Sequence, residues 1–157
     1  MSKHQNSNNF AKYNGKGLTG LANLGNTCFL NSTVQCLSHT YELNEFLDKK
    51  TYKDKLARKP DSLLLVEWDK LRELMWSENC TIQPGGFINN VQKVAKMKDK
   101  DLFTGWAQND LPEFLLFIVD AFHTSIMREV EMNIRGNTEN DTDKLAVECY
   151  KMMKNMY

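Results

Sequence analysis

The segment that begins at Asp110 predicts a helix with almost no polar side. Asp110 and Glu113 have the spacing of a capping box and Pro112 suits a first helical turn, so a helix is predicted to begin here. The apolar residues that follow surround its axis: Phe114, Leu115, Phe117, Ile118, Val119, Ala121 and Phe122. A helix that is apolar on nearly every side is a buried helix. We therefore expect this helix to be the centre of the fold.

Other segments repeat apolar residues at the spacing of an amphipathic helix. These repeats are Leu30, Val34 and Leu37; Leu43, Phe46 and Leu47; Leu64, Trp68, Leu71 and Met75; Phe87, Val91 and Val94; and Leu145, Cys149, Met152 and Met156. Asp61 or Ser62 is the predicted cap of the third, and Thr142 or Asp143 that of the last. The predicted fold class is mainly α.

Charge and hydropathy limit the kinds of partner. Lysine plus arginine equals aspartate plus glutamate at 20 each, so no net field favours nucleic acid or an anionic membrane. The run from Lys49 to Lys59 is basic; it is predicted to be a solvated linker, with a patch for an acidic partner as the alternative. No apolar run reaches the roughly 18 residues of a membrane span. We expect neither nucleic acid nor a membrane as partner.

The cysteines and the first residues indicate a compartment. The four cysteines form no CxxC pair, which predicts free thiols and no zinc site. Residues 1–16 are polar and lack the apolar core of a signal peptide, so we expect a disordered lead-in. Together these features predict an intracellular protein, cytoplasmic, nuclear or both.

Residues 17–37 read GLTGLANLGNTCFLNSTVQCL and deliver Cys28 to the start of a predicted helix. Asn26 or Thr27 is the expected N-cap. A cysteine in a first helical turn lies among unpaired N–H groups at the positive end of the helix dipole, which favours the thiolate. The sequence therefore indicates a nucleophile, with a buried structural cysteine as the alternative.

The loop before Cys28 also suits acyl transfer. Gly20 and Gly25 permit backbone conformations and close approaches that a Cβ would block. Asn23 lies five residues before the cysteine. Its side-chain amide, together with a backbone N–H at the helix start, could stabilise the oxyanion that forms when a thiolate attacks a carbonyl.

These residues carry a resemblance to a known family. The stretch GLANLGNTCFLNSTVQCL resembles the cysteine box of the ubiquitin-specific proteases, which are papain-like deubiquitinases. The resemblance implies that Cys28 is the nucleophile and Asn23 the oxyanion-hole residue. Phe29 stands where the family often has tyrosine.

A second segment, FTGWAQNDLPEFLLFIVDAFH, is similar to the glutamine-aspartate box of the same family. Gln108, Asp110 and Glu113 match it, and the resemblance implies that they bind the extended C-terminal tail of ubiquitin. Asn109 and Leu111 depart from the usual glutamine and alanine. A purely capping role is the alternative for Asp110 and Glu113.

The resemblance covers residues 17–157 and implies the helical thumb half of a catalytic domain, with the β palm and fingers absent. The implied reaction is thiol-dependent hydrolysis of the bond after the C-terminal glycine of ubiquitin, with no cofactor and no metal. The family's catalytic histidine and its acid partner would lie further on, so we expect a fragment or a truncated product. A partner polypeptide could also supply the histidine. The competing interpretation is an inactive helical module that binds ubiquitin or acts as a scaffold.

The histidines of this chain are poor candidates for the missing base. His39 is eleven residues beyond Cys28, about 16 Å along a continuous helix. His123 falls near the end of the apolar helix, where the family commonly carries a structural histidine.

Overall fold

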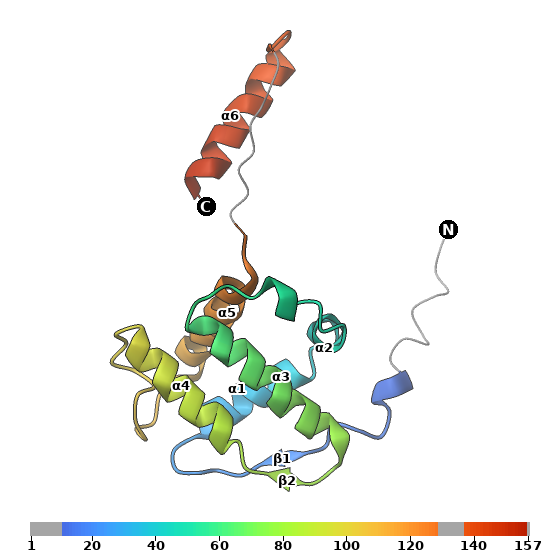
Figure 1. Ribbon diagram of the computed structural model, residues 1–157, viewed down its shortest axis with the longest axis vertical. Helices are drawn as coiled ribbons and strands as arrows, with labels where there is room; N and C mark the ends of the chain where they lie inside the picture. Colours follow the sequence, from blue (N-terminus) through green and yellow to red (C-terminus); the bar gives the residue numbers. More distant parts are fainter. Residues whose placement is uncertain (1–10, 129–136, 157) are drawn as a thin grey trace. The chain divides into compact units, whose positions relative to one another are not determined.

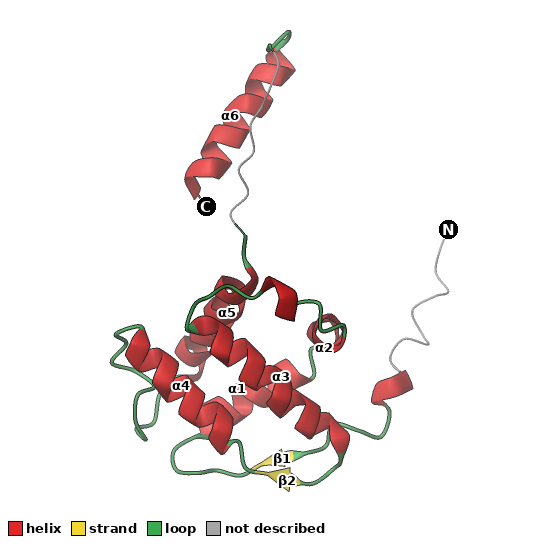
Figure 2. Ribbon diagram, viewed as in Figure 1, coloured by secondary structure: helices red, strands yellow, loops and turns green. Residues whose placement is uncertain are grey.

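The structure is a computed structural model that describes residues 11–128 and 137–156. It divides into two compact units, one ending at Met127 and the other beginning at Arg128, and each is described by itself. The first holds η1 (Ala11–Tyr13), β1 (Gly20–Leu21), α1 (Cys28–Ser38), α2 (Tyr41–Asp48), η2 (Lys53–Lys55), α3 (Asp61–Ser77), β2 (Thr81–Ile82), α4 (Gly85–Met97) and α5 (Leu111–Ile126). The second holds α6 (Asp141–Met156). The helices dominate (Figures 1 and 2), which confirms the predicted mainly α fold.

Helix α3 lies at the centre of the first unit, where it packs against both α4 and α5. Its predicted apolar face is buried, and Trp68 is fully enclosed. The Trp68 ring lies 6.2 Å from that of Phe87 on α4 and 6.3 Å from that of Phe122 on α5. The aromatic contacts of one side chain therefore join three helices.

The prediction that α5 forms the buried centre is wrong for one of its faces. Phe114 and Ile118 are fully buried where α5 packs on α1 and α3. Leu115, Leu116 and Val119 are 37%, 70% and 48% exposed. Within the described residues, neighbouring helices cover only one side of α5, which periodicity alone does not reveal.

A two-stranded parallel sheet joins the segment before α1 to the segment between α3 and α4. Gly20 pairs with Thr81 and Leu21 with Ile82. The Gly20 N–H donates to the Cys80 carbonyl at 2.8 Å. This short sheet places the loop before Cys28 beside the helix pair α3 and α4.

The first described residues differ from the predicted disordered lead-in. The Tyr13 ring of η1 stacks on Tyr41 with 4.4 Å between ring centroids, and Lys12 pairs with Asp48 at 3.0 Å. Residues 11–16 therefore pack on the helical unit. Residues 1–10 lie outside the described part of the chain.

Two predicted caps are also wrong. Pro60 occupies the N-cap of α3, and Asp61 is instead a buried first-turn residue that accepts a hydrogen bond from Lys98 at 2.7 Å. In the second unit, Asn140 accepts from the Asp143 N–H at 2.8 Å at the start of α6. The helical prediction for this last segment is confirmed, and no helix of the described ranges is long and apolar enough to cross a membrane.

The basic run after α2 is not a solvated linker throughout. Tyr52 is fully buried and its hydroxyl donates to Asp69 Oδ2 at 2.6 Å. Lys50 also pairs with that carboxylate, and Arg72 Nη2 donates to Asp69 Oδ1 at 2.8 Å. A buried carboxylate needs compensating hydrogen-bond donors. Lys50 and Tyr52 supply them to Asp69, so this part of the basic run packs on α3.

The donors around Asp69 change its acidity. Burial by itself raises the pKa of this carboxyl, but the hydrogen bonds from its three partners outweigh burial and hold the pKa below its usual value. The lowered folded pKa makes the carboxylate stabilising above its unfolded pKa of about 3.9. That contribution is lost as the pH falls through the lower, folded pKa.

We predict that Asp69→Asn lowers the free energy of unfolding at pH 7 by about 3–5 kcal/mol, because it removes the buried counter-charge of Arg72 and Lys50. Urea denaturation followed by circular dichroism measures this loss. The difference in the free energy of unfolding between wild type and Asp69→Asn should become smaller below about pH 4. The exposed Asp54 of η2 provides the matched control, since Asp54→Asn should change stability by less than about 0.5 kcal/mol. Equal stability of Asp69→Asn and wild type at pH 7 would contradict the assignment.

Candidate active site

Cys28 is the first residue of α1, as predicted, and its thiol is exposed. The alternative of a buried structural cysteine therefore does not hold. The first turn of a helix leaves its backbone N–H groups without intrahelical partners. An exposed sulfur beside such donors is placed to react with a carbonyl and to share the developing charge with the backbone.

Thr27 occupies the N-cap position, but its side chain does not cap the helix. The buried hydroxyl instead donates to Asn23 Oδ1 at 3.0 Å and accepts from the Leu24 N–H at 3.2 Å. Asn26, the other predicted cap, has a left-handed backbone with φ 52°. The Thr27 side chain thus stabilises the loop before Cys28 and does not cap α1.

Asn23 is oriented by this loop. Its Oδ1 accepts hydrogen bonds from the Gly25 N–H at 3.0 Å, from the Thr27 N–H at 3.2 Å and from the Thr27 hydroxyl. Backbone N–H groups can only donate, so the carbonyl end of the amide must face the loop. The exposed amide nitrogen, Nδ2, makes no hydrogen bond to the described residues. Asn23 therefore keeps two N–H donors that are not used by the described residues, and its oxyanion role stays a prediction.

Two further amides on α1 hold the strand that leads into this loop. Gln35 Nε2 donates to the Thr19 carbonyl at 2.7 Å. Asn31 Nδ2 donates to the Ala22 carbonyl at 3.2 Å and to the Leu21 carbonyl at 3.3 Å. The four-residue spacing puts both amides on one side of the helix. The helix that carries the nucleophile thus also fixes the segment that precedes Asn23.

Gln108, Asp110 and Glu113 are all exposed at the start of α5. Asp110 is the N-cap residue, but its carboxylate makes no capping hydrogen bond, so the predicted capping box is not formed. Pro112, in the first turn, removes one of the N–H groups that a cap would accept from. The purely capping alternative for Asp110 is therefore wrong, and its carboxylate is open to a ligand.

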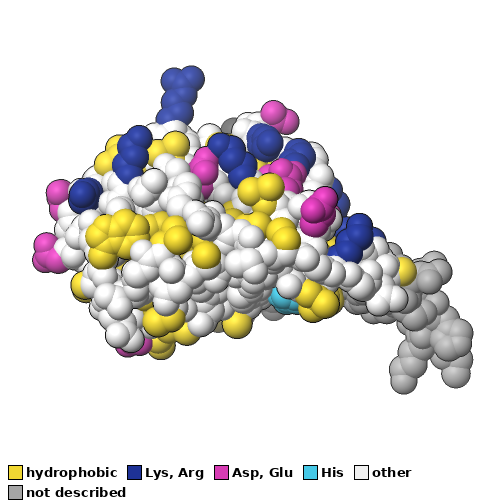
Figure 3. Space-filling view, turned by 90° about the horizontal axis from the view of Figure 1, so that it is seen from below, with side chains coloured by type: hydrophobic (Ala, Val, Ile, Leu, Met, Phe, Trp, Pro, Cys, Tyr) yellow, Lys and Arg dark blue, Asp and Glu magenta, His cyan; other side chains and the backbone are white. Residues whose placement is uncertain are grey.

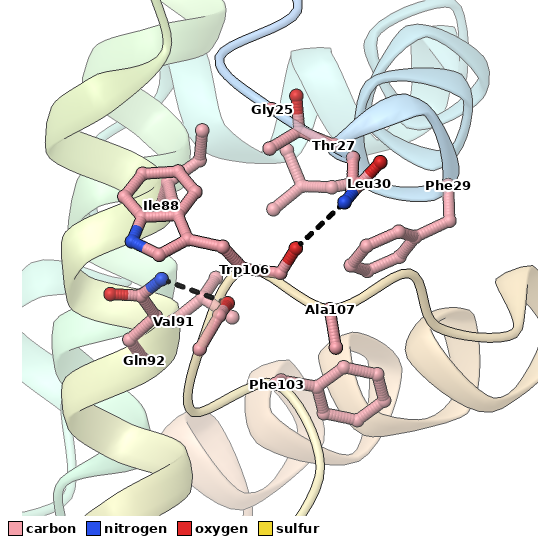
Figure 4. Close-up of a pocket in the computed structure, with 12 residues that line it drawn as sticks. Gly25, Thr27, Phe29, Leu30, Ile88, Val91, Gln92, Phe103, Trp106 and Ala107 are labelled. Carbon is pink, nitrogen blue, oxygen red and sulfur yellow. Dashed lines mark hydrogen bonds between the residues drawn. The ribbon is translucent and has the colours of Figure 1, made fainter.

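The loop before Cys28 and the loop before Gln108 meet. Asn26 Nδ2 donates to the Trp106 carbonyl at 3.1 Å, and Gln92 Nε2 of α4 donates to the Gly105 carbonyl at 3.1 Å. A small pocket lies between the two loops, with Phe29, Phe103 and Trp106 among its lining residues (Figure 4). No sequence motif pointed to Asn26, Gln92 or Trp106 in these roles, because each contact spans a long sequence separation.

Helix α1 separates His39 from Cys28. His39 follows the last residue of a continuous α1, about 16 Å from the cysteine. Its ring packs at 5.3 Å from Trp76, and its Nδ1 contacts the Gln35 carbonyl at 3.0 Å. His123 is exposed in the last turn of α5. Among the residues that the structure describes, no group of His, Cys, Asp and Glu could hold a metal ion.

Figure 3 shows one face of the molecule, with positive, negative and hydrophobic side chains intermingled. No single sign of charge dominates this face, in keeping with the formal net charge of zero.

The structure thus places an exposed thiol at a helix start, after a loop amide whose N–H groups make no hydrogen bond to the described residues. The model of the family "Ubiquitin carboxyl-terminal hydrolase" matches residues 19–156. The chain therefore belongs to this family, that of the ubiquitin-specific proteases.

The relatives agree with this assignment. Human ubiquitin carboxyl-terminal hydrolase 2 is 37% identical over 129 residues, covering 80% of this chain and 20% of the relative. Drosophila melanogaster Usp2 is 36% identical over 132 residues, covering 83% and 13%. Putative ubiquitin carboxyl-terminal hydrolase 11 of Arabidopsis thaliana is 32% identical over 155 residues, covering 94% and 17%. The chain thus spans a fifth or less of the length of these relatives.

A solved structure is also similar. It is a chain in the SAGA DUB module Ubp8/Sgf11/Sus1/Sgf73 bound to monoubiquitin, with a TM-score of 0.54 and 29% identity. The match covers 70% of this chain and 25% of that chain. It supports the interpretation of this fold as a helical part of a ubiquitin-specific protease domain.

Two substitutions at Asn23 test whether its Oδ1 supports the loop. Asn23→Asp retains oxygens for all three donors of the loop, so its free energy of unfolding should stay within about 0.5 kcal/mol of wild type. Asn23→Ala removes the acceptor and should cost about 1–3 kcal/mol. Urea denaturation of both variants measures the difference. Equal losses would show that Oδ1 does not support the loop.

Proposed function

We propose that this chain is the N-terminal thumb part, residues 17–157, of the catalytic domain of a thiol-dependent deubiquitinase. The reaction is hydrolysis of the isopeptide or peptide bond after the C-terminal glycine of ubiquitin. The observation that carries the proposal is the orientation of Asn23, whose carbonyl is held by the loop and whose N–H donors remain available in the loop that leads to the exposed Cys28.

In the proposed mechanism the Cys28 thiolate attacks the carbonyl carbon of the ubiquitin terminus. The C–S bond forms while the carbonyl π electrons move to oxygen, and Asn23 Nδ2–H and a backbone N–H at the start of α1 stabilise that oxyanion. Collapse of the intermediate breaks the C–N bond, and the leaving amine takes a proton from the general acid. Water then hydrolyses the thioester with proton transfer to the same group.

Recognition of the ubiquitin tail is assigned to Gln108, Asp110 and Glu113. Their side chains are exposed at the start of α5, and the loop that carries them is hydrogen-bonded to the loop of Cys28. A strand-like peptide with basic side chains pairs well with an amide and with carboxylates. The bound monoubiquitin of the similar DUB module supports ubiquitin as the partner class.

We propose that the general base is not one of the histidines that the structure describes. His39 lies at the far end of α1 from Cys28, and its ring is packed on Trp76. In this proposal, further chain or a partner polypeptide supplies the histidine and its acid. No cofactor or metal is required for the chemistry.

A second candidate function is an inactive helical module that binds ubiquitin or acts as a scaffold. The observation that favours it is the separation of Cys28 from His39 along α1, since loss of a proton-transfer group typically costs 10²- to 10⁴-fold in rate. The oriented donors of Asn23 favour the enzyme instead, because binding alone does not require an oxyanion hole.

We also propose that the protein acts inside the cell, in the cytoplasm, the nucleus or both. All four cysteines are free thiols with exposed side chains, an arrangement suited to a reducing compartment. Imaging of a tagged chain in cells would test this, and export to the medium would contradict it.

The decisive test uses ubiquitin that carries a thiol-reactive electrophile at its C-terminus. We predict a covalent adduct, detected by intact mass, that is lost in Cys28→Ala. Cys36 is also exposed on α1, so Cys36→Ala is the matched control and should form the adduct as wild type does. Labelling that survives in Cys28→Ala would overturn the assignment of the nucleophile. A folded chain that binds ubiquitin without forming an adduct would favour the inactive module.

A further inference from the structure

We propose that Asn26 is a positioning residue. It sets the loop of residues 103–110, here called the tail loop, at a fixed distance from the nucleophile. This inference rests on the proposed function and adds a residue to it. Asn26 lies two residues before Cys28, and the carbonyl it holds, that of Trp106, lies two residues before Gln108. One hydrogen bond of 3.1 Å therefore joins the two functional motifs across 80 residues of sequence.

The backbone at Asn26 is shaped for this contact. Its φ of 52° lies in the left-handed region, which asparagine enters more readily than most residues. Its side-chain amide reaches the Trp106 carbonyl of the other loop, and of the two dashed lines in Figure 4 the one that ends at Trp106 marks this bond. Carbonyl oxygens accept only, so the amide nitrogen is the end that must face Trp106.

The tail loop has a second anchor on its other side. Gln92 of α4 donates to the Gly105 carbonyl, so adjacent peptide groups of the loop are held from two directions. The Trp106 side chain is 53% exposed, and its ring passes over Gly25, where a Cβ added to the glycine would lie 4.0 Å from Trp106 Cε3. Among the hydrogen bonds of the described residues, the bond from Gln92 is the one that remains at these two carbonyls when the Asn26 bond is lost.

The chemical consequence concerns alignment. The tail must be held by Gln108 and Asp110 while its terminal carbonyl reaches the Cys28 sulfur at a near-attack distance of about 3–3.5 Å. A displacement of about 1 Å between the two loops can cost about 100-fold in rate. Asn26 contributes by fixing their spacing and does not itself touch the reacting atoms.

The test compares Asn26→Gly and Asn26→Asp with Asn90→Ala. Glycine keeps the left-handed backbone without the donor, and aspartate keeps the shape but presents an acceptor to the Trp106 carbonyl. Asn90 is a partly exposed amide on α4 whose side chain donates locally, to the Gly86 carbonyl at 3.0 Å. The readouts are the binding and inactivation constants for the ubiquitin electrophile, and the rate at which iodoacetamide alkylates Cys28.

We expect the second-order rate of adduct formation to fall about 10- to 100-fold in both Asn26 variants, mainly through slower inactivation within the bound complex, because the tail is held but its carbonyl is misaligned with Cys28. Alkylation by iodoacetamide, which needs no tail loop, should stay within about twofold of wild type. Asn90→Ala should leave both rates unchanged. Equal loss in both reactions would indicate a general structural role and overturn the proposal, as would unchanged adduct formation.

Hydrogen exchange separates failure of this inference from failure of the proposed function. If wild type forms no adduct, the coupling of the loops is judged by amide exchange in residues 103–110. Faster exchange there in Asn26→Gly, with no change in Asn90→Ala, would support the positioning role even though the enzymatic proposal had failed. Unchanged exchange would overturn it.

Discussion

The site depends on how an irregular loop satisfies its own polar groups. The segment before α1 has only one short parallel strand, so most of its N–H and C=O groups need partners other than a sheet. Side-chain amides supply them: Asn23 accepts from the loop, while Asn31 and Gln35 donate to its carbonyls. Because an amide has a donor end and an acceptor end, each bond also fixes which end remains for a substrate.

The helical unit behind this loop has a different kind of polar support. Asp69 is a buried carboxylate on the central helix, and its donors come from the run after α2 and from the next turn of α3. Arg72 extends the network by pairing with Asp48 at 2.9 Å. Apolar packing around Trp68 and this ion-pair network thus hold the same helix from two sides. A stable α3 in turn provides the surface on which α4 and α5 pack.

Much of the secondary structure followed from local patterns. Leu64, Trp68, Leu71 and Met75 repeat at helical spacing and are all buried, and Cys28 begins its helix as expected. The caps were less predictable, because Asp61 and Asp110 are residues that favour N-caps yet make other contacts or none. A lysine partner for Asp61 and a proline after Asp110 changed the local outcome. The lysine partner of Asp61 is 37 residues away and cannot be seen in a local pattern, whereas Pro112 stands in the pattern itself, where it also indicates a first helical turn.

The sequence by itself determined the helical class, the position of the nucleophile at a helix start and, through two motifs, the family. Those features are local, since side-chain spacing and a few neighbouring residues are enough to specify them. Only the tertiary structure decided that α3 rather than α5 is central, that Tyr52 is buried, and that Asn26 reaches Trp106. Each of these depends on which segments pack together over long sequence separations, and the energy of such contacts is set by geometry that no single stretch of sequence contains.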